Sequence, residues 1–386
     1  MTNSNEVLIN NARIVLEDQV LSGHIQIRDG KISDIGEGVL TNGAAAQAED
    51  FDGDYLLPGF VELHTDHVEG HYAPRPSVRW NPMAAVLAHD AQIAASGITT
   101  VFDALRVGLD TDADLQYDDM WALAEAFQIG IDDQSLRADH FLHLRCEVSA
   151  NDCLSAFSQF ENHDLVKLIS VMDHSPGQRQ FTNIDQYAVY YKNKLNMNDD
   201  EFRAFCDRRI ALSQNNSDKH RSAIAQICQE RGFILASHDD ATLEHVQEAI
   251  EQDIHVAEFP TTFVAAKASH DAGMAVLMGA PNVVRGGSHS GNIAAQDLAE
   301  AGVLDILSSD YIPFSLVQAV FYLADKVDAI SLPHAVKMVS SNPAKATGLT
   351  DRGEISIGKR ADFSRVKRSN GIPVVHKVWR EGQRIV

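Results

Sequence analysis

His64 and Asp66 have the residue types and the spacing of a pair of metal ligands. They stand two positions apart in an apolar segment that begins at Gly59, and more histidine, glutamate and arginine residues follow in the next loop. Alternate residues of a β-strand point to the same side, so this imidazole and carboxylate can hold one cation together. In the ordinary alternative, His64 packs in a core and Asp66 caps a turn. Further ligands must therefore come from the rest of the chain.

Later apolar segments of strand length also end in polar or ionisable side chains. These are Asp103, Glu147, Asp173, His174, His238, Asp239, Asp240, Glu258, Asn282 and Asp310. Any one histidine is more often structural than a ligand, but imidazole and carboxylate groups gathered at one place favour divalent transition metals. We therefore expect one or two divalent ions, with zinc as the expected metal. The expected ligands are His64, Asp66, Glu147, His174, His238 and Asp310.

Glu147 and Asp310 receive more specific roles. In the segment 140–149, the apolar residues occupy even positions from 142 to 148, so the odd positions, Glu147 included, point inward if this strand belongs to a barrel. Glu147 is then the expected bridge between two ions. Asp310 is the expected general base, since a carboxylate can take the proton of a water that a divalent ion has acidified. In the alternative interpretation Asp310 caps a helix, because Pro313 can begin a helix soon after it.

Arginines beside the same segment ends indicate an anionic substrate. A guanidinium binds phosphate or carboxylate in a bidentate manner, although a surface role is more common for any single arginine. The stretch RGGSHSGN adds glycines that can turn backbone N–H groups toward an anion at a helix N-terminus. The expected substrate-binding residues are Arg75, Arg79, Arg106, Arg145, Arg179, Arg285, Gly286, Gly287, Ser288 and His289.

The composition restricts the partners. Among 386 residues, 54 acidic residues outnumber 32 lysines and arginines, which gives a formal charge of -22. Such a surface repels nucleic acid and anionic membranes, so we expect neither as a partner and a small anionic, phosphorylated molecule as the substrate. The four cysteines show no C-x-x-C spacing, and no signal-like or membrane-spanning stretch is present, which predicts a cytoplasmic protein. A homo-oligomer is compatible with this sequence.

The elements that must position these residues form an α/β pattern. Between 56 and 348, eight strand-like segments alternate with helical ones, which predicts a (β/α)8 TIM-type barrel with its site at the carboxyl ends of the strands. The segments 1–55 and 349–386 are rich in short strands and predict one small discontinuous β-sandwich domain. A helical insertion around 181–231 is too long for a simple crossover, and we expect it over the barrel mouth.

Local signals support these elements. Asp29-Gly30 lies between two alternating segments and predicts a hairpin turn. Asn81-Pro82 combines a capping residue with a proline of the first turn, and therefore predicts a helix start.

Several motifs resemble a known family. HTDHVEGHYAPRPSVRW, HLRCEVS, MDHSPGQRQF, MGAPNVVRGGSHSGN and LSSDYIPFSL resemble the amidohydrolase superfamily and, within it, the phosphonate-metabolism diphosphatases that act on ribose 1-methylphosphonate 5-triphosphate. The resemblance implies a metal-dependent hydrolase that releases pyrophosphate, with metal ligands at the six positions given above. Two residues depart from the pattern: the superfamily usually shows His-x-His where this chain has Asp66, and His67 replaces a smaller polar residue.

Two other functions remain open from the residues alone. An amidohydrolase can act at carbon, by amide hydrolysis or deamination of a small anionic substrate, because one fold hosts many chemistries. A barrel can also serve as a non-catalytic assembly component.

Overall fold

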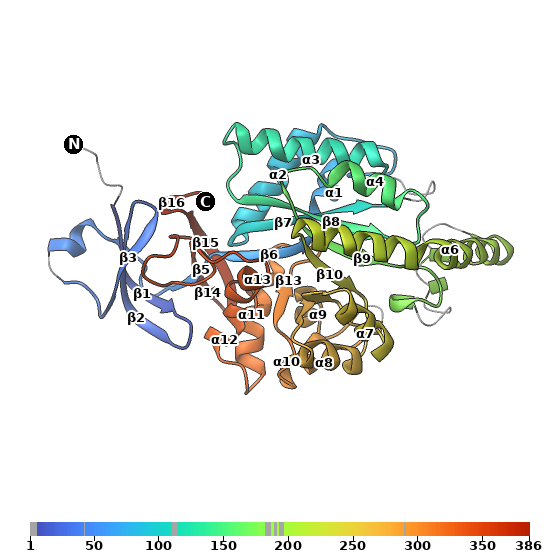
Figure 1. Cartoon of the computed structure of the whole chain (residues 1–386). Coiled ribbons are helices and arrows are strands. Elements are labelled where there is room, and N and C mark those ends of the chain that lie inside the picture. The colour runs from blue at the N-terminus through green and yellow to red at the C-terminus, as the bar shows by residue number, and fades with distance from the viewer. Residues whose placement is uncertain are drawn as a thin grey trace.

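The computed structural model describes residues 6–41, 43–109, 115–181, 187–188, 191–192, 197–288 and 291–386. Two eight-stranded sheets organise these residues, one parallel and central, the other built from both ends of the chain (Figure 1). Among the described residues, no helix combines the length and the apolar character needed to span a bilayer.

The central sheet is a nearly closed parallel barrel. Its strands pair in sequence order, and an isolated bridge between Thr65 and Asp310 joins the first strand to the end of the last. The Thr65 hydroxyl donates to the Asp310 carbonyl oxygen at 2.7 Å. The predicted barrel is thus confirmed. Its strands are β6 (Phe60–Thr65), β7 (Ile98–Val107), β8 (Asp139–Glu147), β9 (Val166–Met172), β10 (Ile234–His238), β11 (Val256–Glu258), β12 (Ala275–Gly279) and β13 (Ile306–Ser308).

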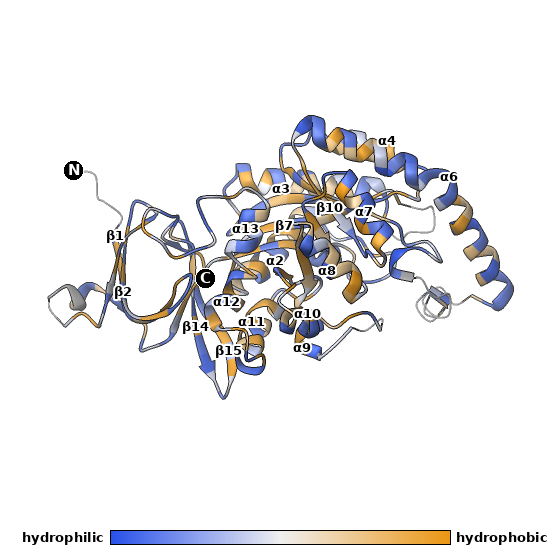
Figure 2. Cartoon of the chain, turned by 60° about the horizontal axis from the view of Figure 1, so that its bottom comes forward, coloured by the Kyte–Doolittle hydropathy of each residue, from blue (hydrophilic) through white to orange (hydrophobic). Residues whose placement is uncertain are grey.

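Helices cover the barrel because each strand presents one apolar face outward. Leu142, Leu144 and Cys146 of β8 pack in one buried cluster with Phe127, as the alternation in β8 predicted, and the strands carry much of the apolar colour in Figure 2. The helices are α1 (His67–Tyr72), α2 (Pro82–Ala95), α3 (Tyr117–Asp132), α4 (Cys153–Phe160), α6 (Asp199–Arg231), α7 (Leu243–Glu251), α8 (Phe263–Asp271), α9 (Ala280–Arg285), α10 (Ala295–Glu300), α11 (Ser315–Lys326), α12 (Leu332–Lys337) and α13 (Ser341–Ala346).

The second sheet joins the two ends of the chain. Its central strand β5 pairs in parallel with β1 and antiparallel with β14, so the first and last segments share one connected sheet. The turn at Asp29 and Gly30 has φ of 52° and 76°, which confirms the predicted hairpin. The strands are β1 (Glu6–Val15), β2 (Val20–Arg28), β3 (Lys31–Glu37), β4 (Glu49–Asp50), β5 (Tyr55–Pro58), β14 (Phe363–Ser369), β15 (Ile372–Arg380) and β16 (Gln383–Arg384).

Capping residues set the starts of two helices. The Asn81 side chain accepts from the Ala84 N–H at 3.0 Å, which confirms the predicted start of α2. Asn198 and Glu201 form a capping box at the start of α6. Figure 1 shows α6 extending outward from the barrel at the end opposite the second sheet. Part of the predicted insertion lies outside the described residues, and its role as a cover of the barrel mouth stays a prediction.

A buried charge network lies behind the first barrel strands. His140 Nδ1 is 2.7 Å from Asp103 Oδ2, and His140 Nε2 is 3.3 Å from Asp90 Oδ1. Asp90 also accepts from the Arg137 guanidinium at 2.8 Å. Burial alone would lower the pKa of His140, but the two carboxylates outweigh it and raise this pKa to about 9.

We expect the stability contribution of His140 to depend on pH. A folded pKa near 9 against an ordinary value of 6.5 means that the contribution is full below pH 6.5 and is lost as pH rises through 9. The pKa difference corresponds to roughly 3 kcal/mol. Urea unfolding of the protein and of His140→Gln should therefore show a gap in free energy of unfolding that narrows with rising pH. A gap of equal size on both sides of this range would contradict the charge assignment.

Candidate active site

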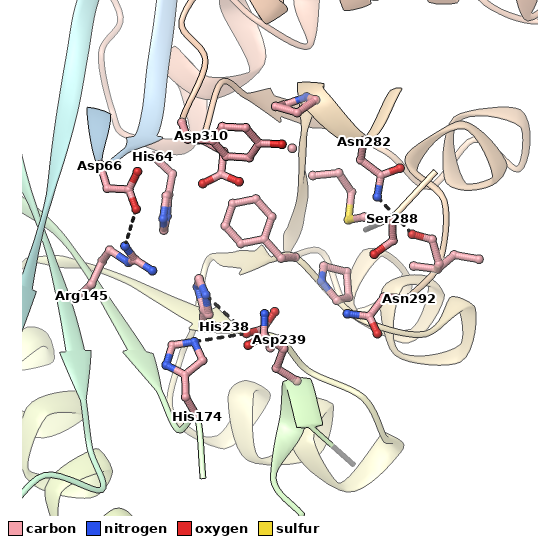
Figure 3. Close-up of a pocket in the computed structure, with 18 of the residues that line it drawn as sticks. His64, Asp66, Arg145, His174, His238, Asp239, Asn282, Ser288, Asn292 and Asp310 are labelled. Atoms are coloured by element: carbon pink, nitrogen blue, oxygen red, sulfur yellow. Dashed lines mark hydrogen bonds and ion pairs between the residues drawn. The ribbon is translucent and has the colours of Figure 1, made fainter. Parts of the chain in front are cut away.

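A cavity of about 310 Å³ opens at the carboxyl ends of the barrel strands (Figure 3). Strand ends of a barrel meet at one face, so ligands that are far apart in sequence can converge there. Of the predicted metal ligands, those in the cavity lining are His64, Asp66, His174, His238 and Asp310.

Glu258, at the end of β11, holds two histidines in a common orientation. Nδ1 of His64 lies 3.1 Å from one oxygen of Glu258, and Nδ1 of His238 lies 3.1 Å from the other. The two rings are stacked with their centroids 5.5 Å apart. A carboxylate on Nδ1 fixes the tautomer and leaves Nε2 as the free lone pair, which is the usual outer shell of a metal-binding histidine. Burial lowers the pKa of both histidines, so the neutral ligand form is favoured.

His174 repeats this arrangement with a different carboxylate. Its Nδ1 lies 2.7 Å from Glu147 Oε2, and its Nε2 lies 3.6 Å from Asp239 Oδ2. Nε2 of His238 is 3.5 Å from that same Asp239 oxygen. Burial opposes protonation of His174, but the Glu147 charge outweighs it and raises the pKa of His174 to about 9. The Nδ1 atoms of all three imidazoles thus contact glutamate carboxylates, and an aspartate lies between two of the Nε2 atoms. This arrangement suits a divalent transition metal.

The structure places Glu147 differently from the expected bridge. One of its oxygens engages the His174 ring, the other accepts from the Ser149 hydroxyl at 2.6 Å, and Glu147 is absent from the cavity lining. Asp239 Oδ2 lies in the cavity between the Nε2 atoms of His174 and His238. Sequence reasoning counted Asp239 and Glu258 among the polar strand ends but gave them no role; their position immediately after His238 and at the end of β11 was the available signal.

Asp310 faces the same cavity from the end of the last strand. Its N–H donates to the His64 carbonyl at 3.1 Å, which ties it to the first strand. Its φ of 54° lies in the left-handed region, which is sparsely populated for residues other than glycine and is frequent at functional sites. Burial, followed by the nearby charge of Asp66, raises the pKa of Asp310 to about 7. Arg145 Nη1 donates to Asp66 Oδ2 at 3.1 Å and fixes that carboxylate.

The predicted arginines divide into two groups. Those that line the cavity are Arg106, Arg145 and Arg285. Arg79 instead donates to Asp119 at 3.3 Å, and Arg75 is exposed outside the lining.

Arg179, which was also expected at the substrate, is absent from the cavity lining. It is buried and pairs with Asp240 and Glu248, two carboxylates that were not expected to be its partners. These ion pairs account for its burial, because a buried guanidinium needs carboxylate partners.

The glycine-rich loop reaches the cavity by a longer route than expected. A short helix, α9, stands between β12 and the loop, and Gly286 ends this helix with a φ of 78°. Gly287 and Ser288 line the cavity, together with Asn282 of α9. Asn282 also accepts from the Ala295 N–H at 3.0 Å, which joins both ends of the loop. His289 lies outside the described residues.

Comparison with known proteins agrees with this geometry. A family model described as "Amidohydrolase family" matches residues 197–368. The alpha-D-ribose 1-methylphosphonate 5-triphosphate diphosphatase of Escherichia coli (strain K12) is 44% identical over 380 residues, which cover 98% of this chain and 100% of that protein. The chain belongs to this diphosphatase family. It is therefore a metal-dependent hydrolase of the amidohydrolase superfamily, and both expectations are confirmed.

More distant relatives match this diphosphatase family member over a shorter segment or at lower sequence identity. A D-hydantoinase of Rhizobium radiobacter is 35% identical over 100 residues, which are 25% of this chain and 20% of that protein. The crystal structure of N-acetylglucosamine-6-phosphate deacetylase from Pasteurella multocida has a TM-score of 0.64 at 14% identity, covering 98% of this chain and 99% of that one. A 5-methylcytosine deaminase from Klebsiella pneumoniae has a TM-score of 0.66 at 14% identity, covering 98% and 97%. These structures share the fold.

Proposed function

We propose that this enzyme hydrolyses alpha-D-ribose 1-methylphosphonate 5-triphosphate, releasing pyrophosphate and leaving the 5-phosphate. The observation that carries the proposal is a single cavity in which the histidine and aspartate set faces Arg106 and Arg285. A neutral substrate gives no reason for guanidinium groups beside a metal site, whereas a triphosphate does. The 44% identity to the E. coli diphosphatase supports this choice of substrate.

The cavity histidines and aspartates are the residues we assign to metal. His64, His174 and His238 would hold one or two divalent ions through their Nε2 atoms, with zinc as the expected ion. Asp66, Asp239 and Asp310 would supply the oxygen ligands. When bound, such an ion supplies Lewis-acid activation of water and of a phosphoryl oxygen.

The chain's own residues perform the remaining work. Asp310 accepts a proton from the attacking water, since its carboxylate follows the last barrel strand and faces the cavity. Glu258 and Glu147 keep the histidine rings in place. Arg106 and Arg285 neutralise the triphosphate, with the Ser288 hydroxyl also in the cavity lining. Catalysis of phosphoryl transfer rests mainly on such positioning and charge stabilisation.

The surroundings of this reaction are also part of the proposal. All four cysteines are buried free thiols, which agrees with a reducing cytoplasm. A pathway of phosphonate breakdown in the cytoplasm is the setting that we assign, and a homo-oligomer is compatible with it.

Arg285→Ala should raise KM for the triphosphate about 10- to 100-fold, because a hydrogen bond to a charged group contributes roughly 1.5–3 kcal/mol. Arg75→Ala is the matched control, since Arg75 is exposed and lies outside the cavity lining. Steady-state pyrophosphate release on the two variants measures the difference. Equal KM values for Arg285→Ala and the unchanged enzyme would instead favour an amidohydrolase that acts at carbon.

A further inference from the structure

One face of helix α6 carries four polar side chains. They are Ser213, Asn216, Ser217 and His220, whose i, i+3, i+4, i+7 spacing places them on one side of an α-helix. Three of the four are buried, and Asn216 is half-buried. Toward its C-terminus the helix is held by apolar packing instead, as at Ile224. The polar face needs hydrogen-bond partners, because an unpaired buried polar group costs free energy.

Two of these side chains hold Asp173, the first residue after β9. The hydroxyls of Ser213 and Ser217 donate to Asp173 Oδ2 at 2.6 and 2.7 Å. These lengths are typical of hydrogen bonds to an ionised carboxylate. The other Asp173 oxygen accepts from the Ser175 N–H at 3.0 Å. Asp173 thus closes a turn around the residue between them, which is His174, one of the histidines that we assign to metal.

The other two side chains of this face hold the end of the neighbouring strand β8. Asn216 Nδ2 donates to the Ser149 carbonyl at 3.0 Å, and His220 Nδ1 lies 2.9 Å from the carbonyl oxygen of the preceding residue. The Ser149 hydroxyl in turn donates to Glu147, the carboxylate that contacts His174. One helix face therefore binds both strand ends that carry the Glu147–His174 pair.

The serine contacts restrict position more than apolar packing does. A serine inside a helix often bonds to the backbone carbonyl four residues earlier. A hydroxyl has a single hydrogen to donate, and in Ser213 and Ser217 it goes to Asp173. A hydrogen bond depends steeply on distance and angle, whereas an apolar core tolerates swaps of similar volume. Metal ligands must be held within about 0.5 Å of their working geometry, so contacts of this kind suit a segment that carries a ligand.

We propose that Asp173, Ser213 and Ser217 are positioning residues for the metal ligand His174. None of the three lines the catalytic cavity, and they act through the turn that Asp173 closes. The inference rests on the metal site of the proposed function, and it gives α6 a role at that site. The long helix then contributes to the shape of the metal site without contacting the ion or the substrate.

Zinc affinity tests this proposal, because it does not depend on which substrate is cleaved. Ser213→Ala/Ser217→Ala removes both hydroxyl donors from the Asp173 carboxylate. Its zinc dissociation constant, from a chelator competition titration, should rise roughly 10-fold, the low end of the usual effect of an outer-shell partner. Ser222→Ala is the matched control, since Ser222 is exposed on the same helix, and it should bind zinc as the unchanged protein does.

Steady-state kinetics separates positioning from a merely structural role. At limiting zinc, kcat of the double variant should fall while KM for the triphosphate stays unchanged, and kcat should recover at saturating zinc. Circular dichroism establishes that each variant is folded. Ser213→Ala keeps one of the two donors and should show a smaller rise in the dissociation constant, so it decides the matter if the double variant does not fold.

The contrary result is a folded variant with a lower melting temperature but the zinc dissociation constant and kcat of Ser222→Ala. That result would show that the α6 contacts only stabilise the fold, and it would overturn the proposal while leaving the hydrolysis intact. An unchanged protein that binds zinc but releases no pyrophosphate would instead overturn the proposed hydrolysis. A raised dissociation constant in the double variant would still support the positioning role, so the two proposals can fail separately.

Discussion

Asp310→Asn should lower kcat for pyrophosphate release by about 1,000-fold, within the range that general acid–base catalysis contributes. Asparagine keeps the size of the side chain but cannot take the proton of the attacking water. The fold should survive, because the Asp310 backbone bonds to Thr65 and His64 do not involve the carboxylate. Asparagine also tolerates the left-handed φ of 54°.

The comparison for this variant is Asp271→Asn, which removes an exposed carboxylate that pairs with Lys267 on α8. It should leave kcat unchanged. Both variants should keep the melting temperature of the unchanged enzyme within a few degrees. Near-normal turnover by folded, zinc-loaded Asp310→Asn would remove Asp310 from the role of base.

Glu258→Gln should weaken binding of the proposed divalent ion, measured with zinc as the probe, about 10- to 100-fold, the usual effect of losing an outer-shell partner. The carboxylate accepts from two imidazoles at 3.1 Å each. A glutamine offers one acceptor oxygen and one donor group, so it can serve only one of His64 and His238 in the present tautomer. The other ring must rotate or change its tautomer, and its Nε2 is then misdirected.

A chelator competition titration gives the zinc dissociation constant of this variant. Glu244→Gln is the matched control, because Glu244 is an exposed glutamate in the first turn of α7. Activity of Glu258→Gln should recover in part at high zinc concentration, since the ligands themselves remain. An unchanged dissociation constant would show that Glu258 does not orient the ligand histidines.

Local sequence signals were enough to predict much of the fold. The Asn81 cap and the Asp29-Gly30 turn depend on contacts within a few residues, so a single sequence reveals them. Alternation in β8 predicted which side chains face the helices. The convergence of the candidate ligands also followed from topology, because all of them stand at carboxyl ends of strands in one barrel.

Contacts between distant side chains were beyond reach from sequence. Arg179 is held by carboxylates 61 and 69 residues away, and nothing in its own segment indicates them. The positions of Glu147 and Asp239 have the same explanation: strand parity shows that a carboxylate points inward, but not whether it ends beside a ring nitrogen or in the cavity. Rotamers and neighbouring strands decide this.

Phosphorus NMR of the ribosyl 5-triphosphate reaction tests the central claim most directly. The zinc-loaded enzyme should convert each substrate molecule to one pyrophosphate and one 5-phosphate ester, with the methylphosphonate signal retained. The chelator-treated enzyme should give neither product until zinc is restored. Release of orthophosphate in place of pyrophosphate, or turnover that persists without any divalent ion, would contradict a metal-dependent diphosphatase at this cavity.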